Sequence, residues 1–153
     1  MQEGQPKRAL DRLKNIGFVE VGEWVLSDGK ISIKCSAHET AVNVLYAFVV
    51  NDEPVYIGKT TQQLCKRMQQ YRTPGHSQAT NLKNRANIIR ELGEQRNPVG
   101  RVSLFVLPDN GLMLYGGFHL NLAAGLEDSL IKELDPVWNG GKKEPDPAPE
   151  KVR

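Results

Sequence analysis

Two apolar runs, Val44–Val50 and Val55–Ile57, place the tightest constraint on how this chain can fold. Residues 51–54 between them have turn character, and the second run ends at Gly58. Apolar runs of strand length on either side of a short polar turn are typical of a β-hairpin. We therefore predict two antiparallel strands in the middle of the chain.

The segments around this hairpin carry helix and strand patterns of their own. Residues 5–16 have apolar side chains at helical spacing, and residues 18–36 alternate apolar and polar side chains around an Asp-Gly turn. These patterns predict a helix followed by another hairpin. Further helices are predicted over 60–71, 81–93 and 120–134, and a third core strand over 101–107. In the helix over 81–93, the side expected to face the core consists of Leu82, Ile88, Ile89 and Leu92.

Together these elements predict an α+β fold with a small antiparallel three-stranded central sheet flanked by helices. A chain of 153 residues has room for one ordinary domain. We expect an amino-terminal helix and hairpin extension over 1–40 and the main domain over 41–139. The segment 140–153 is rich in proline and poor in apolar residues, so we predict a disordered tail there.

The composition, with 39% hydrophobic and 25% charged residues, is typical of a soluble globular protein. No run of apolar residues approaches the ~18 that a membrane span needs, and the first residues have no signal-peptide core. We therefore expect a cytoplasmic protein with no membrane partner. Cys35 and Cys65 have no metal-site spacing to each other or to a histidine, and we interpret both thiols as reduced and structural.

Basic residues are concentrated between Tyr56 and Arg101, a segment that carries a net charge of +7 while the remainder of the chain carries −5. Such a concentration suits a polyanion, because each phosphate that is neutralised releases counterions. A solvated helical face would show the same pattern, and the charge alone does not separate the two interpretations.

Two charged residues, Glu127 and Arg67, lie on helix sides that should face the core. Glu127 shares a stripe with Leu130 and Leu134, and Arg67 borders the stripe that contains Tyr71. A buried charge is costly unless it is paired or binds a metal. Each residue could therefore form a salt bridge, or both could bind a phosphodiester and its metal ion, since arginine offers a planar fork of donors.

The sequence resembles the GIY-YIG nuclease family at five points that follow one another in order. The first half of the signature is Val44-Leu45-Tyr46, which keeps the tyrosine but lacks the glycine, and the second half is Tyr56-Ile57-Gly58. The arginine, glutamate and asparagine of the family match Arg67, Glu127 and Asn139. This resemblance extends over residues 43–139.

The resemblance implies a metal-dependent DNA endonuclease. Glu127 would hold Mg²⁺ or Mn²⁺, and Arg67 would stabilise the charge of the pentacovalent phosphorane. Tyr46 would be the general base for the attacking water, and Tyr56 would position that water or Tyr46. Asn139 would brace the end of the helix that carries Glu127.

Double-stranded DNA is the partner that the resemblance and the basic segment imply together, and a homo-oligomer is compatible with both. Lys83 is a weaker candidate for the same role as Arg67. The candidate DNA-binding residues are Lys59, Arg72, Lys83, Arg85, Arg90 and Arg96.

Other interpretations of the same residues stay open at this point. Tyr46 and Tyr56 could be ordinary packing aromatics, Asn139 a helix cap and Gly58 a turn glycine. The whole chain could be a catalytically silent DNA-binding module of the same fold, or a protein-interaction domain with an incidental basic face.

Overall fold

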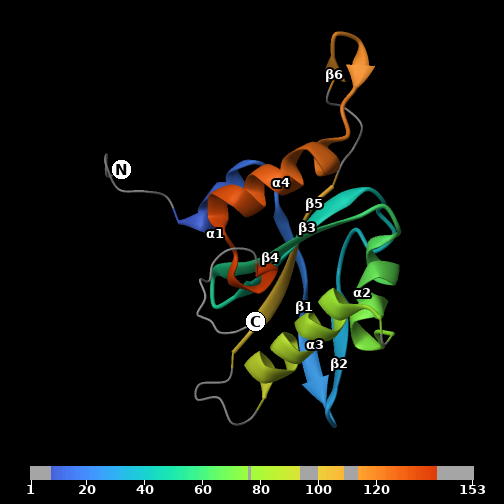
Figure 1. Cartoon of the computed structure of the whole chain (residues 1–153), viewed down its shortest axis with the longest axis vertical. Helices are drawn as coiled ribbons and strands as arrows, with labels where there is room; N and C mark the ends of the chain where they lie inside the picture. Colours follow the sequence, from blue (N-terminus) through green and yellow to red (C-terminus); the bar gives the residue numbers. More distant parts are fainter. Residues whose placement is uncertain (1–7, 76, 94–99, 109–113, 141–153) are drawn as a thin grey trace.

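The computed structural model describes residues 8–75, 77–93, 100–108 and 114–140, and Figure 1 shows their arrangement. The helices are α1 (Ala9–Asn15), α2 (Leu64–Arg72), α3 (Ala79–Leu92), α4 (Leu122–Leu134) and the 3-10 turn η1 (Val137–Asn139). The strands are β1 (Val19–Ser27), β2 (Lys30–Cys35), β3 (Val44–Val50), β4 (Glu53–Thr60), β5 (Val102–Leu107), β6 (Leu114–Tyr115) and β7 (Phe118–His119). None of the described helices is long and apolar enough to cross a membrane. The predicted tail lies outside these residues from position 141 onward.

In the described part of the chain, the strands form a five-stranded antiparallel sheet in the order β2-β1-β5-β3-β4 and a separate pair, β6 and β7. The predicted α+β class is confirmed, but the predicted number of three central strands is wrong. The amino-terminal hairpin belongs to the same sheet because Val19 of β1 pairs with Val106 of β5, and Glu23 pairs with Ser103. This pairing covers an edge of β5 that would otherwise be open.

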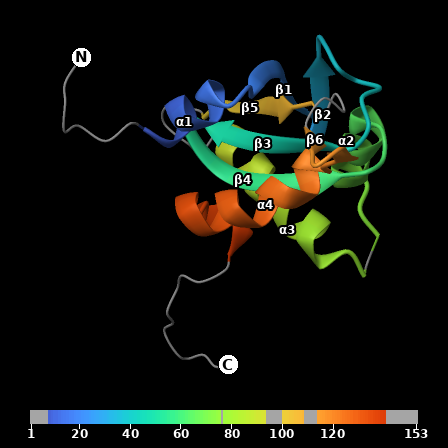
Figure 2. The ribbon, with the colours of Figure 1, turned by 90° about the horizontal axis from the view of Figure 1, so that it is seen from above.

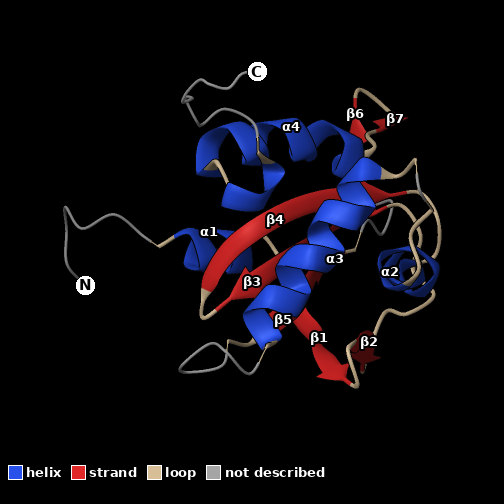
Figure 3. Cartoon of the chain, turned by 60° about the horizontal axis from the view of Figure 1, so that its bottom comes forward, coloured by secondary structure: helices blue, strands red, loops and turns tan. Residues whose placement is uncertain are grey.

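Helices cover both faces of the central strands, as Figures 1 and 3 show. On one face, α2, α3 and η1 enclose an apolar cluster that includes Tyr46, Phe48 and Trp138. On the other face, α1 and α4 pack over a second cluster with Leu45 and Ala47. Successive side chains of β3 therefore enter different cores, and all seven of its residues are buried. This double covering explains why the strand is a continuous apolar run.

The side that helix α3 turns to the sheet differs in part from the one its sequence predicts. Leu82, which was expected in the core, is 42% exposed, whereas Asn81, Asn84 and Asn87 are buried beside Ile88. The other three predicted core positions of this helix are buried or partly buried. The prediction counted only apolar residues, so it could not find a buried side on which three amides occupy helical spacing.

The short hairpin of β6 and β7 is an element that the sequence did not predict. It protrudes from the body of the molecule next to the start of α4 (Figure 1). Its turn residues, Gly116 and Gly117, have φ angles of 59° and 85°, which glycine adopts without strain. Strands of two residues are too short to give an alternating pattern, and this explains the omission.

Candidate active site

The two strands with the tyrosine motifs pair so that Tyr46 of β3 lies opposite Gly58 of β4. A Cβ atom at Gly58 would lie 2.7 Å from both Cζ and Oη of Tyr46 and 2.9 Å from the Tyr56 ring. Gly58 lies inside the strand and not in a turn, so a turn does not explain why this position lacks a side chain. It gives the two tyrosine rings the space to converge at the edge of the sheet.

Helix α2 brings Arg67 and Tyr71 to the same place. They are four residues apart and so lie on one side of the helix. The Tyr71 hydroxyl lies 2.7 Å from the Tyr46 hydroxyl and accepts a hydrogen bond of 3.0 Å from Nη2 of Arg67. Nη1 of Arg67 donates to Gln70, and the guanidinium carbon lies 4.4 Å from the centre of the Tyr71 ring. The result is a fixed arginine beside a group of buried phenols.

Burial raises the pKa of Tyr46, Tyr56 and Tyr71 above their ordinary value of 10.0, because the phenolate form loses its hydration. The positive charge of Arg67 acts in the opposite direction on all three but does not overcome burial. Burial also tends to lower the pKa of Arg67, yet the neighbouring phenols raise it overall. In the isolated protein, the three tyrosines are therefore neutral at physiological pH.

These tyrosines should make the fold sensitive to high pH. Because their pKa is higher in the folded state than the unfolded value of 10.0, the folded protein keeps protons that the unfolded chain releases. Below about pH 10 the tyrosines do not change the free energy of unfolding with pH. Above about pH 10 that free energy falls by about 1.4 kcal/mol per pH unit for each tyrosine. Urea unfolding at several pH values checks this, and Tyr46→Phe should reduce the slope by one such increment. An equal slope in that variant would contradict the prediction.

Glu127 approaches this group from α4, which runs beside the edge strand β4 (Figure 2). Its side chain is 28% exposed, which agrees with the half-buried position that the sequence predicts. Oε1 of Glu127 lies 4.0 Å from Nζ of Lys59, so its cationic neighbour is a lysine and not an arginine. The negative charge of Glu127 also contributes, as a minor cause, to the raised pKa of Tyr56. The carboxylate thus belongs electrostatically to the same site.

Glu127 is the acidic donor that this site offers to a divalent ion. Among the described residues, no group of three or more histidine, cysteine, aspartate or glutamate side chains could hold a metal. A single half-buried carboxylate nevertheless fits Mg²⁺, which keeps several waters and uses one or two carboxylates together with substrate phosphates. Glu127 is therefore the residue that would hold such an ion.

Asn139 binds to the backbone of the edge strand. Its Oδ1 accepts a hydrogen bond of 3.0 Å from the amide of Ile57, and its Nδ2 donates one of 2.9 Å to the Ile57 carbonyl. The side-chain amide therefore braces β4 between Tyr56 and Gly58. The sequence had suggested that Asn139 would brace the end of the helix that carries Glu127. Lys83 also reaches this end of the chain, since a Cβ at Gly140 would lie 2.8 Å from its Nζ.

The candidate DNA-binding residues differ in how exposed their side chains are. Nε of Arg72 donates to the carbonyl of Ile31, and Nε of Arg85 donates to the carbonyl of Arg72, so both side chains are partly buried. Arg85 was expected to face solvent and is instead tied to the end of α2. Arg90 is exposed, and Arg96 lies outside the described residues.

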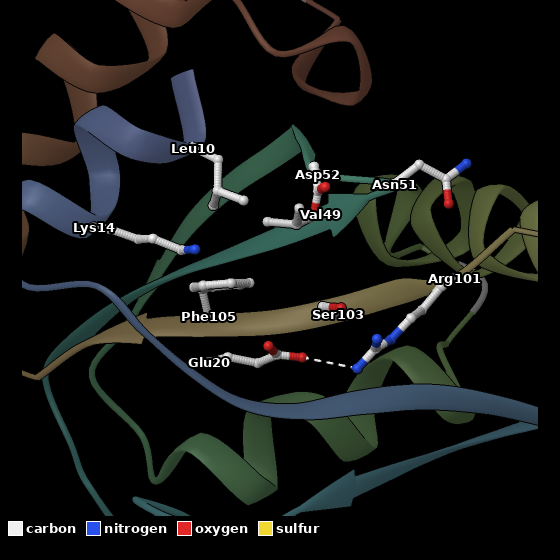
Figure 4. Close-up of a pocket in the computed structure, with 9 residues that line it drawn as sticks. All are labelled: Leu10, Lys14, Glu20, Val49, Asn51, Asp52, Arg101, Ser103 and Phe105. Atoms are coloured by element: carbon white, nitrogen blue, oxygen red, sulfur yellow. Dashed lines mark hydrogen bonds and ion pairs between the residues drawn. The ribbon is translucent and has the colours of Figure 1, made fainter. Parts of the chain in front are cut away.

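A pocket of about 380 Å³ lies on the face of the sheet that α1 covers and shares no residue with this site (Figure 4). It is lined by Leu10, Lys14, Glu20, Val49, Asn51, Asp52, Arg101, Ser103 and Phe105. Arg101 is paired with Glu20 at 3.1 Å and with Glu23 at 3.0 Å. This arginine contributes to the positive charge of the 56–101 segment, but its charge is neutralised locally.

Comparisons with known proteins relate this chain to an endonuclease. No family model matches the sequence. A stretch of 56 residues is 46% identical to endonuclease II of Enterobacteria phage T4 and covers 37% of this chain and 40% of that protein. The structure of a bacteriophage T4 EndoII mutant, with one glutamate changed to alanine, matches with a TM-score of 0.62 and 26% identity. That match covers 88% of this chain and 99% of the other.

A second solved structure, restriction endonuclease HPY188I in complex with product DNA, aligns with a TM-score of 0.42 and 16% identity over 99% of this chain and 98% of that one. A similarity at this level carries no argument about the present chain. The sequence and structural matches to endonuclease II, in contrast, agree with each other and with the GIY-YIG motifs. This chain is therefore related in sequence and fold to endonuclease II of phage T4.

Proposed function

We propose that this protein is a metal-dependent endonuclease that hydrolyses phosphodiester bonds in double-stranded DNA. The observation that carries the proposal is the chain of contacts from Arg67 through Tyr71 to Tyr46. Glu127 lies near enough to act on the pKa of the neighbouring Tyr56. The relation to a phage endonuclease supports the same conclusion. A fixed guanidinium, a buried phenol group and a half-buried carboxylate together suit phosphodiester hydrolysis.

Arg67 is the residue proposed to stabilise the transition state. Its guanidinium is held by Gln70 and Tyr71, so little reorganisation is needed when negative charge develops on the phosphate. Its remaining N–H groups match the spacing of two phosphate oxygens. Lys83 is proposed as a secondary contact to the same phosphate.

Tyr46 is proposed as the general base for the attacking water. Burial opposes its ionisation, but Arg67 and a hydrogen bond donated by Tyr71 both favour the phenolate. This assigns a direction to the Tyr46–Tyr71 contact, in which Tyr71 is the donor during the reaction. Tyr56 is proposed to orient the water, and Asn139 to keep β4 and its tyrosine in position.

Glu127 is proposed to hold Mg²⁺ or Mn²⁺. When bound, such an ion supplies positive charge against the phosphorane and the leaving 3′ oxygen. The half-buried position of Glu127 on α4 favours this role, because a partly desolvated carboxylate attracts a cation more strongly than an exposed one.

The DNA is proposed to lie along the basic side of α2 and α3. Contacts to its phosphates are assigned to Lys59, Arg72, Lys83, Arg85, Arg90 and Arg96. Apart from Lys59 and Lys83, which also belong to the proposed active site, these residues should affect affinity and not the chemical step, since phosphate contacts away from the reacting bond position the duplex.

Salt dependence separates this proposal from a protein-interaction domain. Each phosphate contact should contribute about −0.9 to the slope of log affinity against log salt. Replacing the exposed Arg90 with alanine should make that slope shallower by nearly one unit, while cleavage at saturating DNA stays close to wild type. Binding to a duplex in EDTA at several salt concentrations measures the slope. Duplex binding that is independent of salt would contradict the proposal.

A catalytically silent DNA-binding module is the second candidate. It predicts the same salt slope as the endonuclease, so a separate measurement is needed. Nicking of plasmid DNA with and without Mg²⁺ distinguishes the two, because the silent module binds DNA without cutting it under either condition.

A further inference from the structure

Lys59 and Glu127 form an ion pair in which both side chains are partly buried, at 37% and 28% exposed. In each of the other ion pairs whose two partners are both described, at least one side chain is 61% exposed or more. Lys59 follows Gly58 in β4 and pairs with Leu45, whose side chain belongs to the core beneath α4. The ammonium group is therefore directed toward the helix that carries Glu127.

The two charged groups face each other without a close hydrogen bond. Their separation of 4.0 Å exceeds the 2.7–3.2 Å range that is usual for an N–H···O bond. A lysine ammonium is a point charge on a flexible stem, so it can leave one partner for another at little cost. The geometry is that of an exchangeable counter-ion and not of a fixed structural bridge.

We propose that Lys59 is the resident counter-cation of Glu127, displaced when a divalent ion binds and then free to contact a DNA phosphate. The inference rests on the proposed metal-binding role of Glu127. The physical reason is that a metal ion on this carboxylate would lie close to the ammonium, and the two positive charges would repel each other. The DNA backbone offers the displaced ammonium a new negative partner.

This exchange couples the two ligands of the site. In the absence of DNA, Lys59 competes with the metal ion and weakens its binding. When a phosphate draws the ammonium away, the carboxylate becomes available, so DNA strengthens metal binding and metal strengthens DNA binding by the same factor. The enzyme would then load its metal mainly on DNA.

The test measures Mn²⁺ binding to DNA-free protein by electron paramagnetic resonance. We expect Lys59→Met to bind Mn²⁺ about fivefold more tightly than wild type, since a neighbouring positive charge is removed. Lys59→Arg, which keeps the charge, should stay close to wild type. The matched control is Lys132→Met on α4, which removes a lysine paired with Asp128 at 3.4 Å and should change the affinity by less than about twofold. Unchanged or weaker Mn²⁺ binding in Lys59→Met would overturn the inference.

Glu127→Gln separates a failure of this inference from a failure of the proposed function. If Mn²⁺ binds this variant as it binds wild type, Glu127 is not the metal ligand, and both proposals fail. If Glu127→Gln loses Mn²⁺ binding while Lys59→Met is unchanged, only the role of Lys59 is wrong.

A second measurement uses uncleaved duplex in EDTA. Glu127→Gln should bind the duplex more tightly than wild type because Lys59 is released, and most of this gain should disappear when the same change is made in a Lys59→Met background. An equal gain with and without Lys59 would overturn the phosphate transfer.

Discussion

Replacing Glu127 with alanine is expected to abolish Mg²⁺-dependent DNA cleavage without weakening DNA binding. The substitution removes the carboxylate that would hold the metal ion, and it removes a negative charge from the surface that is proposed to face DNA. Because the side chain is only half-buried, the helix that carries it should fold as before. Plasmid nicking and duplex affinity, measured on the same preparation, check both parts of this prediction.

The matched control for Glu127→Ala is Asp128→Ala. Asp128 is the next residue on α4, carries the same charge and is 78% exposed beside Lys132. Its removal should leave nicking within about twofold of wild type, because an exposed pair contributes little. Nicking by Glu127→Ala at the wild-type rate, or an equal loss in both variants, would contradict the assigned role.

Arg67→Ala is expected to lower the cleavage rate at saturating DNA by about a hundredfold or more. One charge contact that is made in the transition state is worth roughly 3–4 kcal/mol, which corresponds to at least that factor. The affinity for DNA should fall much less. A single-turnover rate with excess enzyme separates the two effects, since it reports the chemical step without binding.

Lys66→Ala is the matched control for Arg67→Ala, because Lys66 is the adjacent cation on α2 and is exposed. It should affect only affinity and its salt dependence. If Arg67→Ala instead loses affinity while its rate at saturating DNA is unchanged, Arg67 positions the phosphate and does not stabilise the transition state.

The strands and helices of the core were predictable because their patterns are local. The run Val44–Val50 and the turn after it gave the hairpin that carries the site, and the stripe around Glu127 gave its half-buried position. Both inferences depend only on periodicity and on the cost of burying charge.

The features that the sequence did not predict depend on contacts between distant residues. The pairing of Val19 with Val106 makes the sheet five-stranded, and no local sequence pattern predicts this pairing. Tyr71 was predicted only as a packing residue, yet its hydroxyl joins Tyr46 to Arg67. Its spacing of four residues from Arg67 was the available signal, but the partner across the sheet becomes visible only in the fold. Lys59 was likewise expected only to contact DNA.

The central claim is that this protein cuts DNA with a metal held at Glu127. The most direct measurement is the conversion of supercoiled plasmid to open-circular or linear DNA by purified wild-type protein with Mg²⁺, in parallel with EDTA and with Glu127→Ala. We expect the wild-type protein to convert the plasmid in Mg²⁺ but not in EDTA, and we expect no conversion by Glu127→Ala in Mg²⁺. An intact plasmid under the conditions in which the wild-type protein binds DNA, or conversion that continues in EDTA, would contradict the claim.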